Sequence, residues 1–464
     1  MFRVTLVCCL MAAPAIAAAQ MPPVLQPPTS PGVGQPPGTD APTSKKPPRV
    51  KKRQPGSAQE APLPEAVPAP ERTPGHAEGI TIEQVEGIAM SNNPSLGRAA
   101  ARVNAARGRW VQAGLYPNPS VGYVGTEIGN EGGAGQQGGM VAQQIVTGGK
   151  LRLSREVAAR DVAVAEQEFE AQRLRVLTDV RIAFYELLVN QTRATLAQQL
   201  VAISERGMKI AEGLFKGKEV AQADVLRAEV ELEMARIELR RSEFARSASW
   251  RNLSAIMGTP DMPCGHAAGA LEGDWPEYDW CQTLQQLLSR SPEMGAAVMR
   301  LERARWALSR ANVEPVPDLN LQGMVQRDDA TRDTIFGAQA TVALPLFNRN
   351  QGNISAAQSE LVAAQRDTDR VAVGLQQRLA PAFQAYESAK VETERYQKVI
   401  IPNAEKILEQ VTVGYRQSEF NYTDLLTAQR TYFQARLSYL EALRQLRAAI
   451  ARIDGLLLWD SLKD

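Results

Sequence analysis

The segment TIFGAQATVALPLFNRNQGNISAAQSELVAAQ, residues 334–365, changes its hydrophobic period in the middle. As far as Leu344 the apolar residues occupy every second position, which predicts a strand with one apolar face. After Asn350 the apolar residues are three or four positions apart, at Ile354, Ala357, Leu361 and Ala364. That spacing predicts one face of a helix. Residues 138–161 show a similar change, so we expect a strand to run directly into a long helix twice.

The two halves of the chain resemble each other in sequence. Three pairs of segments match, namely residues 92–121 with 290–319, 145–153 with 346–354, and 212–237 with 413–437. Prolines take part in the match, because Pro117 aligns with Pro315 and Pro119 with Pro317. A match of this extent indicates a tandem repeat. Each half is predicted to contain a helix, two strands, a very long helix, a tight tip and a further helix.

The predicted strands precede the two long helices. They cover residues 119–128, 138–147, 318–327 and 334–347. Each is close to the roughly ten residues that a tilted membrane-barrel strand needs. Residues 150–211 contain no proline, and residues 351–413 contain only Pro381 and Pro402. A helix of about sixty residues is about 90 Å long, which exceeds the width of a globular domain.

The helix that follows the first tip carries two apolar stripes. One stripe consists of Leu226, Val230, Met234 and Ile237. The other consists of Ala228, Leu232, Ala235 and Leu239. A helix with two apolar stripes packs against two helical neighbours, so helices of this kind can close side by side into a tube.

Composition and charge exclude several classes of protein. The 464 residues include 52 basic and 51 acidic side chains, and this net charge of +1 gives no reason to expect nucleic acid as a partner. After residue 19 no apolar run approaches the ~18 residues of a spanning helix. If the chain crosses a membrane, we therefore expect a closed β-barrel. Four strands cannot enclose a usable channel, whereas three chains would supply twelve.

The N-terminal region is predicted to lie outside the folded part. Residues 1–19 have the pattern of a secretory signal peptide. Residues 20–80 are predicted to be a disordered arm, because 16 of the 29 prolines lie between residues 21 and 75. Its basic run KKPPRVKKR is interpreted as a solvated linker, with contact to anionic lipid or to acidic groups of peptidoglycan as the alternative. The other predicted boundaries are a first repeat at 81–258, an inter-repeat segment at 259–280, a second repeat at 281–458 and a tail at 459–464.

Two cysteines, Cys264 and Cys281, remain once the predicted signal peptide is removed. In an oxidising compartment the leading interpretation is a disulfide between them. Two unbonded thiols are one alternative. A metal site that also uses His266 is another, although the sequence CGH is not a standard spacing of metal ligands.

These features resemble the TolC-like outer-membrane factor family. The resemblance covers residues 81–458, and its most specific parts are the tandem repeat, the segment 344–361 and the segment 400–443. The sequence LFNRNQGN resembles the heavy-metal branch, with its CzcC-like and CusC-like proteins. The resemblance implies a mainly α fold with a membrane β-barrel. In that family three chains form a twelve-stranded barrel in the outer membrane and a twelve-helix tunnel, an α-barrel, across the periplasm.

The resemblance also implies a function. The chain would be the passive outer-membrane channel of a tripartite efflux pump, in contact with outer-membrane lipid, a periplasmic adaptor (a membrane fusion protein) and an inner-membrane RND-type transporter. The implied cargo is a heavy-metal cation such as cobalt, zinc, cadmium, nickel, copper or silver. A drug-efflux or type I secretion channel of the same fold is one alternative. A periplasmic coiled-coil adaptor or scaffold is another, although the tandem strand pairs argue against it.

The resemblance implies that residues of the two tips dock the adaptor. In the first tip the candidate residues are Lys216, Gly217, Lys218, Glu219 and Val220. In the second tip they are Gln417, Ser418, Glu419, Phe420, Asn421 and Tyr422. Gly217 is expected to supply a turn conformation that other residues resist.

Asp224 and Asp424 each begin a predicted helix, so the simplest interpretation is that both are N-caps. The resemblance gives Asp424 a second role, on the wall of the tunnel. Three copies would place a ring of carboxylates there, which attracts cations. The second acidic position of the family is Thr427 in this chain, which would make the ring thinner.

No catalytic, cofactor or metal-binding residues are predicted. The chain has two histidines, far apart in the sequence, and neither a G-x-S-x-G motif nor a phosphate-binding loop. We therefore do not expect an enzyme.

Overall fold

The structure, a computed structural model, describes residues 79–129, 133–273, 275–417 and 419–463. The chain divides into two compact units, residues 1–73 and 74–464, and the described residues all belong to the second. The predicted signal peptide lies outside the described residues, and so does the predicted arm apart from residues 79 and 80. Among the helices in these ranges, none is both long enough and apolar enough to cross a membrane.

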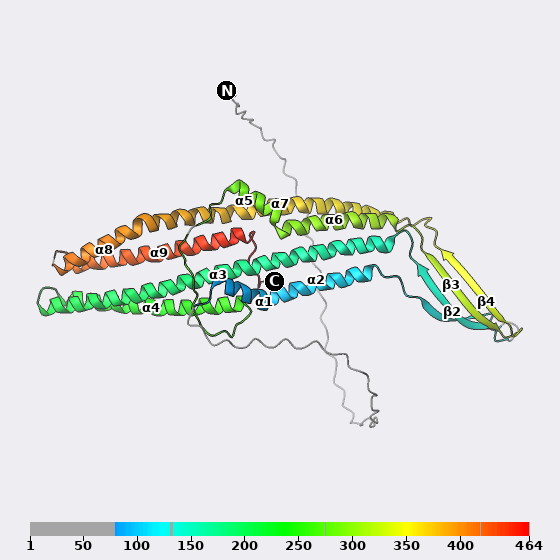
Figure 1. Ribbon diagram of the computed structural model, residues 1–464, viewed down its shortest axis with the longest axis horizontal. Helices are drawn as coiled ribbons and strands as arrows, with labels where there is room; N and C mark the ends of the chain where they lie inside the picture. The colour runs from blue at the N-terminus through cyan, green and yellow to red at the C-terminus, as the bar shows by residue number, and fades with distance from the viewer. Residues whose placement is uncertain (1–78, 130–132, 274, 418, 464) are drawn as a thin grey trace, which may run out of the picture. The chain divides into compact units, whose positions relative to one another are not determined.

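Both halves of the second unit follow one order of elements (Figure 1). The first half consists of α1 (Ile82–Asn92), α2 (Pro94–Ala113), β1 (Ser120–Thr126), β2 (Gln136–Ile145), α3 (Lys150–Lys216) and α4 (Gln222–Ile256). The second half consists of α5 (Trp280–Arg290), α6 (Pro292–Val313), β3 (Leu319–Asp328), β4 (Thr334–Val342), α7 (Gln351–Arg395), η2 (Tyr396–Ile400), α8 (Ile401–Arg416) and α9 (Tyr422–Asp454). The predicted repeat of helix, paired strands, long helix and helix agrees with this order.

Each half begins with two helices where the sequence pattern predicts one. Pro94 and Pro292 occupy the first positions of α2 and α6. A residue before proline is pushed out of the helical region, and Asn93 and Ser291 are accordingly extended. Proline therefore separates α1 from α2 and α5 from α6.

The long helices differ in their continuity. Helix α3 has 67 residues, which corresponds to about 100 Å at the rise of an α-helix. Its counterpart in the second half contains Pro381 within α7 and is interrupted by the π-helical turn η2. Pro402 follows η2 and has no N–H to donate to the preceding turn. A wider turn absorbs this break in the hydrogen-bond ladder.

The four strands form one antiparallel sheet in the order β1-β2-β3-β4. The two middle strands come from different halves of the chain and pair from Gln136↔Asp328 to Ile145↔Leu319. One face of the sheet carries large apolar side chains that are exposed in the single chain, among them Val121, Tyr123, Val141, Leu321, Val325 and Phe336. The other face carries glutamine, asparagine and threonine together with Val124, Met140, Met324 and Ile335. The alternation predicted for residues 334–344 is therefore confirmed as far as Val342.

The strand β4 ends at Val342, earlier than the predicted end at residue 347. Pro345 follows shortly afterwards and cannot donate to a ladder of strand hydrogen bonds. The turn into α7 is completed by Asn350, which has a positive φ of 61°. Gly149 has the same left-handed conformation, with φ 67°, at the start of α3. Asparagine and glycine are the residues that tolerate this conformation best.

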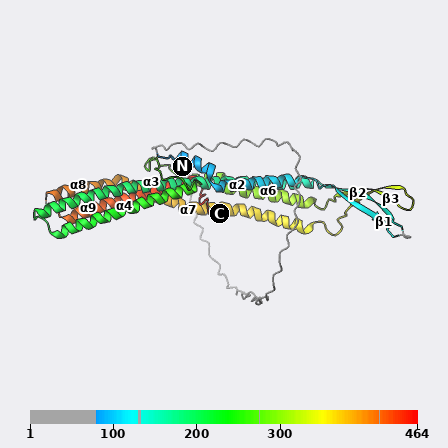
Figure 2. The same cartoon turned by 90° about the horizontal axis from the view of Figure 1, so that it is seen from below.

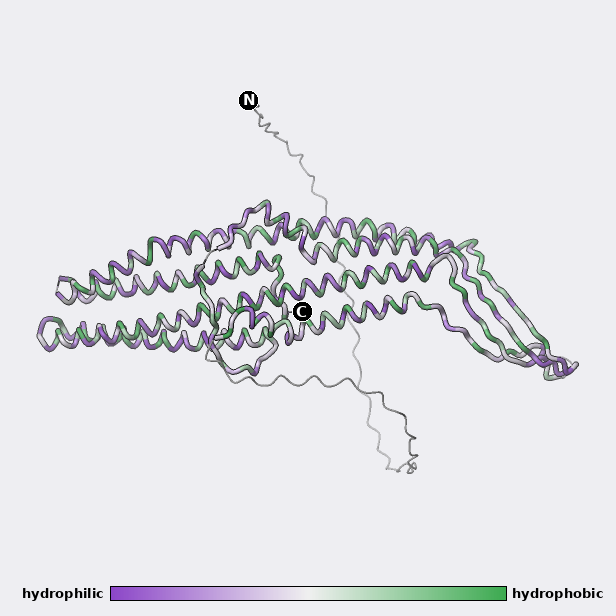
Figure 3. Tube along the Cα trace, viewed as in Figure 1, coloured by the Kyte–Doolittle hydropathy of each residue, from purple (hydrophilic) through white to green (hydrophobic). Residues whose placement is uncertain are grey.

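The sheet and the helical tips lie at opposite ends of the long helices (Figures 1 and 2). Helices α2, α3, α6 and α7 lie between the sheet and the middle of the unit. From the middle to the tips the helices are α3, α4, α9 and the continuous helix formed by the end of α7, η2 and α8. Hydrophilic and hydrophobic residues alternate along all of these helices, as Figure 3 shows. Polar and apolar residues are therefore interspersed along the whole length of these helices.

The inter-repeat segment, residues 259–280, is called the linker below. It crosses one face of the helices and is fixed there by hydrogen bonds. The Leu271 carbonyl accepts from Arg447 of α9 at 2.9 Å, and Tyr439 of α9 donates to Glu272 at 2.7 Å. Tyr386 of α7 donates its hydroxyl to the Pro276 carbonyl at 2.6 Å. We call this side of the helices the linker face and the opposite side the open face.

The two apolar stripes of α4 have different environments. Ala228, Leu232 and Ala235 are buried, and α4 packs along α3. The second stripe is unpartnered in the single chain, with exposures of 54% for Leu226, 55% for Val230, 56% for Met234 and 53% for Ile237. Within the described part of the chain, one of the two helical neighbours that the stripes predict is therefore present, and the other is not.

Candidate functional site

The first tip turns through Lys218 and not through Gly217. Gly217 has an ordinary φ of −73°, whereas Lys218 has a φ of +63°. The Lys218 N–H donates to the Phe215 carbonyl at 2.9 Å, and the Glu219 N–H donates to the Leu214 carbonyl at 2.9 Å. The expectation that Gly217 supplies the special turn conformation is therefore wrong, because the left-handed position falls one residue later.

This geometry predicts opposite roles for the two residues. A left-handed L-residue costs roughly 1–2 kcal/mol, so Lys218→Gly is expected to stabilise the protein by up to about 1 kcal/mol after the extra backbone entropy of glycine is subtracted. Gly217→Ala is expected to be neutral or slightly stabilising, because its φ suits any residue. Urea-induced unfolding of both variants tests this. A destabilised Gly217→Ala protein would restore the original expectation for Gly217.

The second tip begins α9 with a capping box. Asn421 is the N-cap, and its side chain accepts from the Asp424 N–H at 2.9 Å. In return the Asp424 carboxylate accepts from the Asn421 N–H at 3.1 Å. Asp424 therefore stabilises the start of the helix from the third position and is not itself the N-cap. Asp224 also occupies the third position of its helix, where the N-cap is Ala221 and Asp224 pairs with Arg227 at 3.3 Å.

The two tips share one hydrophobic cluster. Ala211 and Ala228 from the first hairpin pack with Tyr415, Tyr422 and Leu425 from the second. Burial, together with the smaller effect of the nearby Glu231 carboxylate, raises the pKa of the Tyr422 hydroxyl to about 12. The hydroxyl is therefore protonated at physiological pH and adds no negative charge to the tips.

Most of the predicted docking residues are accessible in the single chain. The exposed ones are Lys216, Gly217, Lys218, Glu219, Gln417, Glu419, Phe420 and Asn421. Val220 is half-buried, and Tyr422 is buried in the shared cluster. Ser418 lies outside the described residues. Tyr422 thus holds the two hairpins together and offers little surface to a partner.

A polar stripe runs along α9 from the second tip. Asp424, Thr427, Thr431, Gln434 and Ser438 follow one another at alternating spacings of three and four, and the first four are exposed. These spacings are those of heptad positions a and d, which share one side of a helix. The α9 residues that contact the linker region, Tyr439, Leu443 and Arg447, occupy the opposite positions b, f and c. The stripe therefore lies on the open face.

Cys264 and Cys281 are free and exposed, so the predicted disulfide is not formed in the structure. The two residues are held by different parts of the fold. Gly265, next to Cys264, lies against the buried ring of Trp250 in α4, whereas Cys281 lies in α5, which packs on α7. Nothing in the sequence pattern shows this separation. Across the described ranges there is also no group of three or more His, Cys, Asp or Glu residues placed to hold a metal ion.

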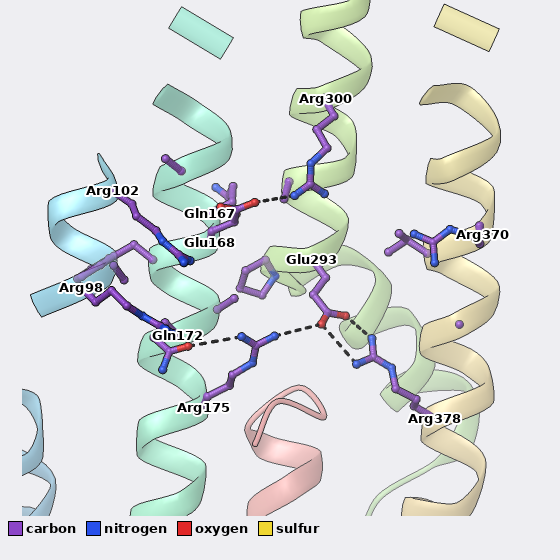
Figure 4. A pocket seen from close by; sticks show the side chains of 18 of the residues that line it. Arg98, Arg102, Gln167, Glu168, Gln172, Arg175, Glu293, Arg300, Arg370 and Arg378 are labelled. Atoms are coloured by element: carbon purple, nitrogen blue, oxygen red, sulfur yellow. Dashed lines mark hydrogen bonds and ion pairs between the residues drawn. The ribbon is translucent and has the colours of Figure 1, made fainter. Parts of the chain in front are cut away.

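One feature of the open face is not evident in the sequence. A groove is lined by Arg98, Arg102, Arg175, Arg300, Arg370 and Arg378, which come from α2, α3, α6 and α7 (Figure 4). Within a single helix, the sequence shows only that Arg98 and Arg102 are four residues apart and that Arg370 and Arg378 are eight residues apart. The spacings cannot reveal that four separate helices bring these arginines together.

Comparison with known proteins gives the family. Residues 87–259 and 283–457 match the family described as "Outer membrane efflux protein". The two ranges cover more than half of the chain, and the chain belongs to this family. It is an outer-membrane protein, and its family and structural relatives are channels and not enzymes.

The relatives agree with the resemblance to heavy-metal channels. The chain is 26% identical over 385 residues to the cobalt-zinc-cadmium resistance protein CzcC of Cupriavidus metallidurans, covering 83% of this chain and 91% of that protein. It is 24% identical over 296 residues to the nickel-cobalt-cadmium resistance protein NccC of Alcaligenes xylosoxydans xylosoxydans, covering 62% and 65%. A solved structure of CusC superposes with a TM-score of 0.68 at 16% identity, covering 82% of this chain and 92% of that chain. The predicted resemblance to the TolC-like family and the mainly helical fold with four strands are confirmed.

Proposed function

We propose that three copies of this chain form the outer-membrane channel of a tripartite efflux pump for heavy-metal cations. The observation that carries this proposal is the set of unfilled surfaces on the single chain. The exposed stripe of α4 lies at one edge of the helical layer. Helix α8 lies at the other edge and exposes Ile407 and Val413. Packing α4 of one copy against α8 of the next would bury both surfaces and close the helices into a tunnel.

The sheet supports the same assembly. Strands β1 and β4 each have one neighbour among the described strands, so each leaves a row of backbone groups without a partner. Pairing β4 of one copy with β1 of the next would give twelve strands in a closed sheet. Its apolar face, with Val121, Val325 and Phe336, would meet lipid, while the polar face would line the channel.

The cargo is inferred from the relatives. CzcC and NccC are named for resistance to cobalt, zinc, cadmium and nickel. No described helix could cross the inner membrane, so in this proposal a separate transporter supplies the energy. We therefore expect a strain that lacks this chain to become sensitive to one or more of these metals. Growth in graded metal concentrations measures this, and complementation with the wild-type chain is the control. Unchanged metal tolerance together with increased drug sensitivity would favour a drug channel instead.

Asp424 is proposed to face the tunnel near its narrow periplasmic end. Its support is the polar stripe on the open face of α9. The linker lies on the opposite face, and in a closed ring of helices the bulky linker belongs outside. The open face then lines the tunnel, and three Asp424 carboxylates approach one another there. Like charges in proximity repel unless a cation lies between them, so such a ring favours cations. Thr427, one helical turn away, adds a hydroxyl and no charge.

Two substitutions separate this role from the capping role. Asp424→Asn keeps an oxygen that can accept from the Asn421 N–H but removes the charge, so we expect weaker cation selectivity with little loss of stability. Asp424→Ala also removes the carboxylate's half of the capping box and should cost about 1 kcal/mol of stability. Reversal potentials in planar bilayers and thermal unfolding provide the two measurements. Unaltered selectivity in Asp424→Asn would leave Asp424 with the capping role alone.

The exposed tip residues are proposed to dock the periplasmic adaptor. Both tips lie at the end of the helices far from the sheet (Figure 1). Lys216 and Lys218 are exposed on the first tip, and Glu419 is exposed on the second. The adaptor would therefore meet basic and acidic side chains at neighbouring positions around the tunnel mouth. Charge reversal at Lys216 and Lys218 tests this contact by co-purification of the adaptor.

A further inference from the structure

The arginine-lined groove described above has a volume of about 600 Å³. Its six arginines are accompanied by two acidic residues, Glu168 and Glu293. Counted over the described residues that line the groove, six guanidinium groups and two carboxylates give a net charge of +4. Such an excess on one concave surface attracts and holds anions.

The two carboxylates are already engaged by part of this charge (Figure 4). Glu293 lies between Arg378, to which it is hydrogen-bonded, and Arg175 at 3.9 Å. Glu168 pairs with Arg300 at 2.6 Å. These pairs link α3, α6 and α7 and fix the shape of the groove. These pairs do not involve Arg102, which has no ion pair within the described part of the chain, so its positive charge remains available to a ligand.

The groove opens on the face opposite the linker. Leu375 and Leu379 of α7 are buried in a cluster with Leu287 of α5, which directly follows the linker. Val371, which packs beside this cluster, and Gln377, which is two residues from each of these leucines, both line the groove. Residues two apart on a helix point about 160° away from each other. The groove therefore extends around α7 from the edge of this cluster to the open face, the same side as the polar stripe of α9.

We infer that this groove binds a multivalent oxyanion, a phosphate or a polycarboxylate. Arginine keeps its charge at any physiological pH, and its planar donors match the paired oxygens of these anions. The placement of the groove on the tunnel wall rests on the trimer proposed above. In that trimer three grooves form a band of positive charge between the sheet and the middle of the tunnel. A cation that has passed the Asp424 ring then crosses this band, where the bound anion balances the positive charge of the arginines.

Arg102 and Arg370 are the residues to substitute. Within the described part of the chain, neither has an ion pair with another helix, and Arg370 pairs with Asp367 of its own helix at 2.7 Å. Arg102→Gln together with Arg370→Gln therefore removes half of the net charge without breaking an ion pair between helices. The matched control is Arg305→Gln. Arg305 pairs with Glu302 of its own helix at 2.6 Å. Arg305 lies eleven residues, about three turns, after Met294, so the two residues are on the same side of α6. Met294 packs in the Leu287 cluster on the linker face.

The first test is calorimetric titration of the detergent-solubilised full chain with inorganic phosphate and, separately, with citrate. We expect at least one anion to bind the wild type and the Arg305→Gln control, and this binding to be lost in the double variant. Which anion binds identifies the class of ligand. No binding of either anion to the wild type would overturn the inference. So would equal binding by the double variant, or an equal loss in the control.

The second test uses planar bilayers with a potassium chloride gradient. In the double variant we expect the reversal potential to shift towards the potassium equilibrium potential, because each proposed trimer loses six positive charges. The control should keep the wild-type value. A conducting channel whose reversal potential is the same in all three proteins would contradict the placement of the band on the wall. Anion binding without any conductance would instead overturn the proposed channel and leave the binding site in place.

Discussion

Replacing both Val230 and Ile237 with glutamate is expected to leave the chain monomeric. Both side chains are more than half exposed in the single chain, so their loss should not unfold it. In the proposed trimer they pack against α8 of the next copy, where burying each aliphatic side chain contributes about 1.5–3 kcal/mol. A carboxylate left unpaired in that interface costs several kcal/mol more. With two substitutions at each of three interfaces, the assembly should not survive.

Light scattering of the detergent-solubilised protein measures the mass of the assembly. Circular dichroism shows whether the helices remain. The matched control is Glu229→Lys, which changes the charge of α4 by two units at an exposed position beside the stripe. We expect the control to form trimers. A double variant that still assembles as three chains would show that the α4 stripe is not a subunit interface.

Phe336→Arg is expected to prevent stable insertion into the outer membrane. Phe336 is 77% exposed on the apolar face of the sheet, opposite Val325 of the neighbouring strand. On the lipid side of a membrane sheet, an arginine near the middle of the bilayer costs about 2–4 kcal/mol. In the proposed trimer this free-energy cost arises once in each of the three copies. Fractionation of cell membranes should therefore show little of the variant in the outer membrane.

The control for this prediction is Gln339→Arg on the same strand. Gln339 lies an odd number of residues from Phe336, so it points to the polar face of the sheet. That face would line the water-filled channel, where a charge changes selectivity and not insertion. We expect normal amounts of this variant in the outer membrane. Equal insertion of both variants, or failure of the control alone, would reverse the assignment of the two faces.

Much of the fold follows from local patterns in the sequence. The period of two in residues 334–342 and the change to spacings of three and four at Ile354 determine where β4 gives way to α7. The absence of proline from residues 150–211 determines that α3 is one uninterrupted helix. Proline also explains the differences between pattern and structure, because Pro345 ends β4 early and Pro402 follows the wide turn η2.

Features that depend on the path of the chain were predicted less well. The left-handed position of the first tip falls on Lys218, because the closing hydrogen bonds to Phe215 and Leu214 fix the register of the turn. Asp424 was correctly associated with the start of α9, but its role in a capping box required the position of Asn421. The separation of Cys264 from Cys281 depends on which helices the linker contacts.

The sequence by itself determined the tandem repeat, the sheet with one apolar face, the long helices and the two apolar stripes of α4. These are periodic features, and a period can be recognised from residues that are close together in the sequence. Only the tertiary structure decided which stripe is filled within the chain, which face carries the linker, and that six arginines from four helices line one groove. These features depend on residues that are far apart in the sequence, such as Arg98 and Arg378. The distance between such residues in space is set by how the helices pack.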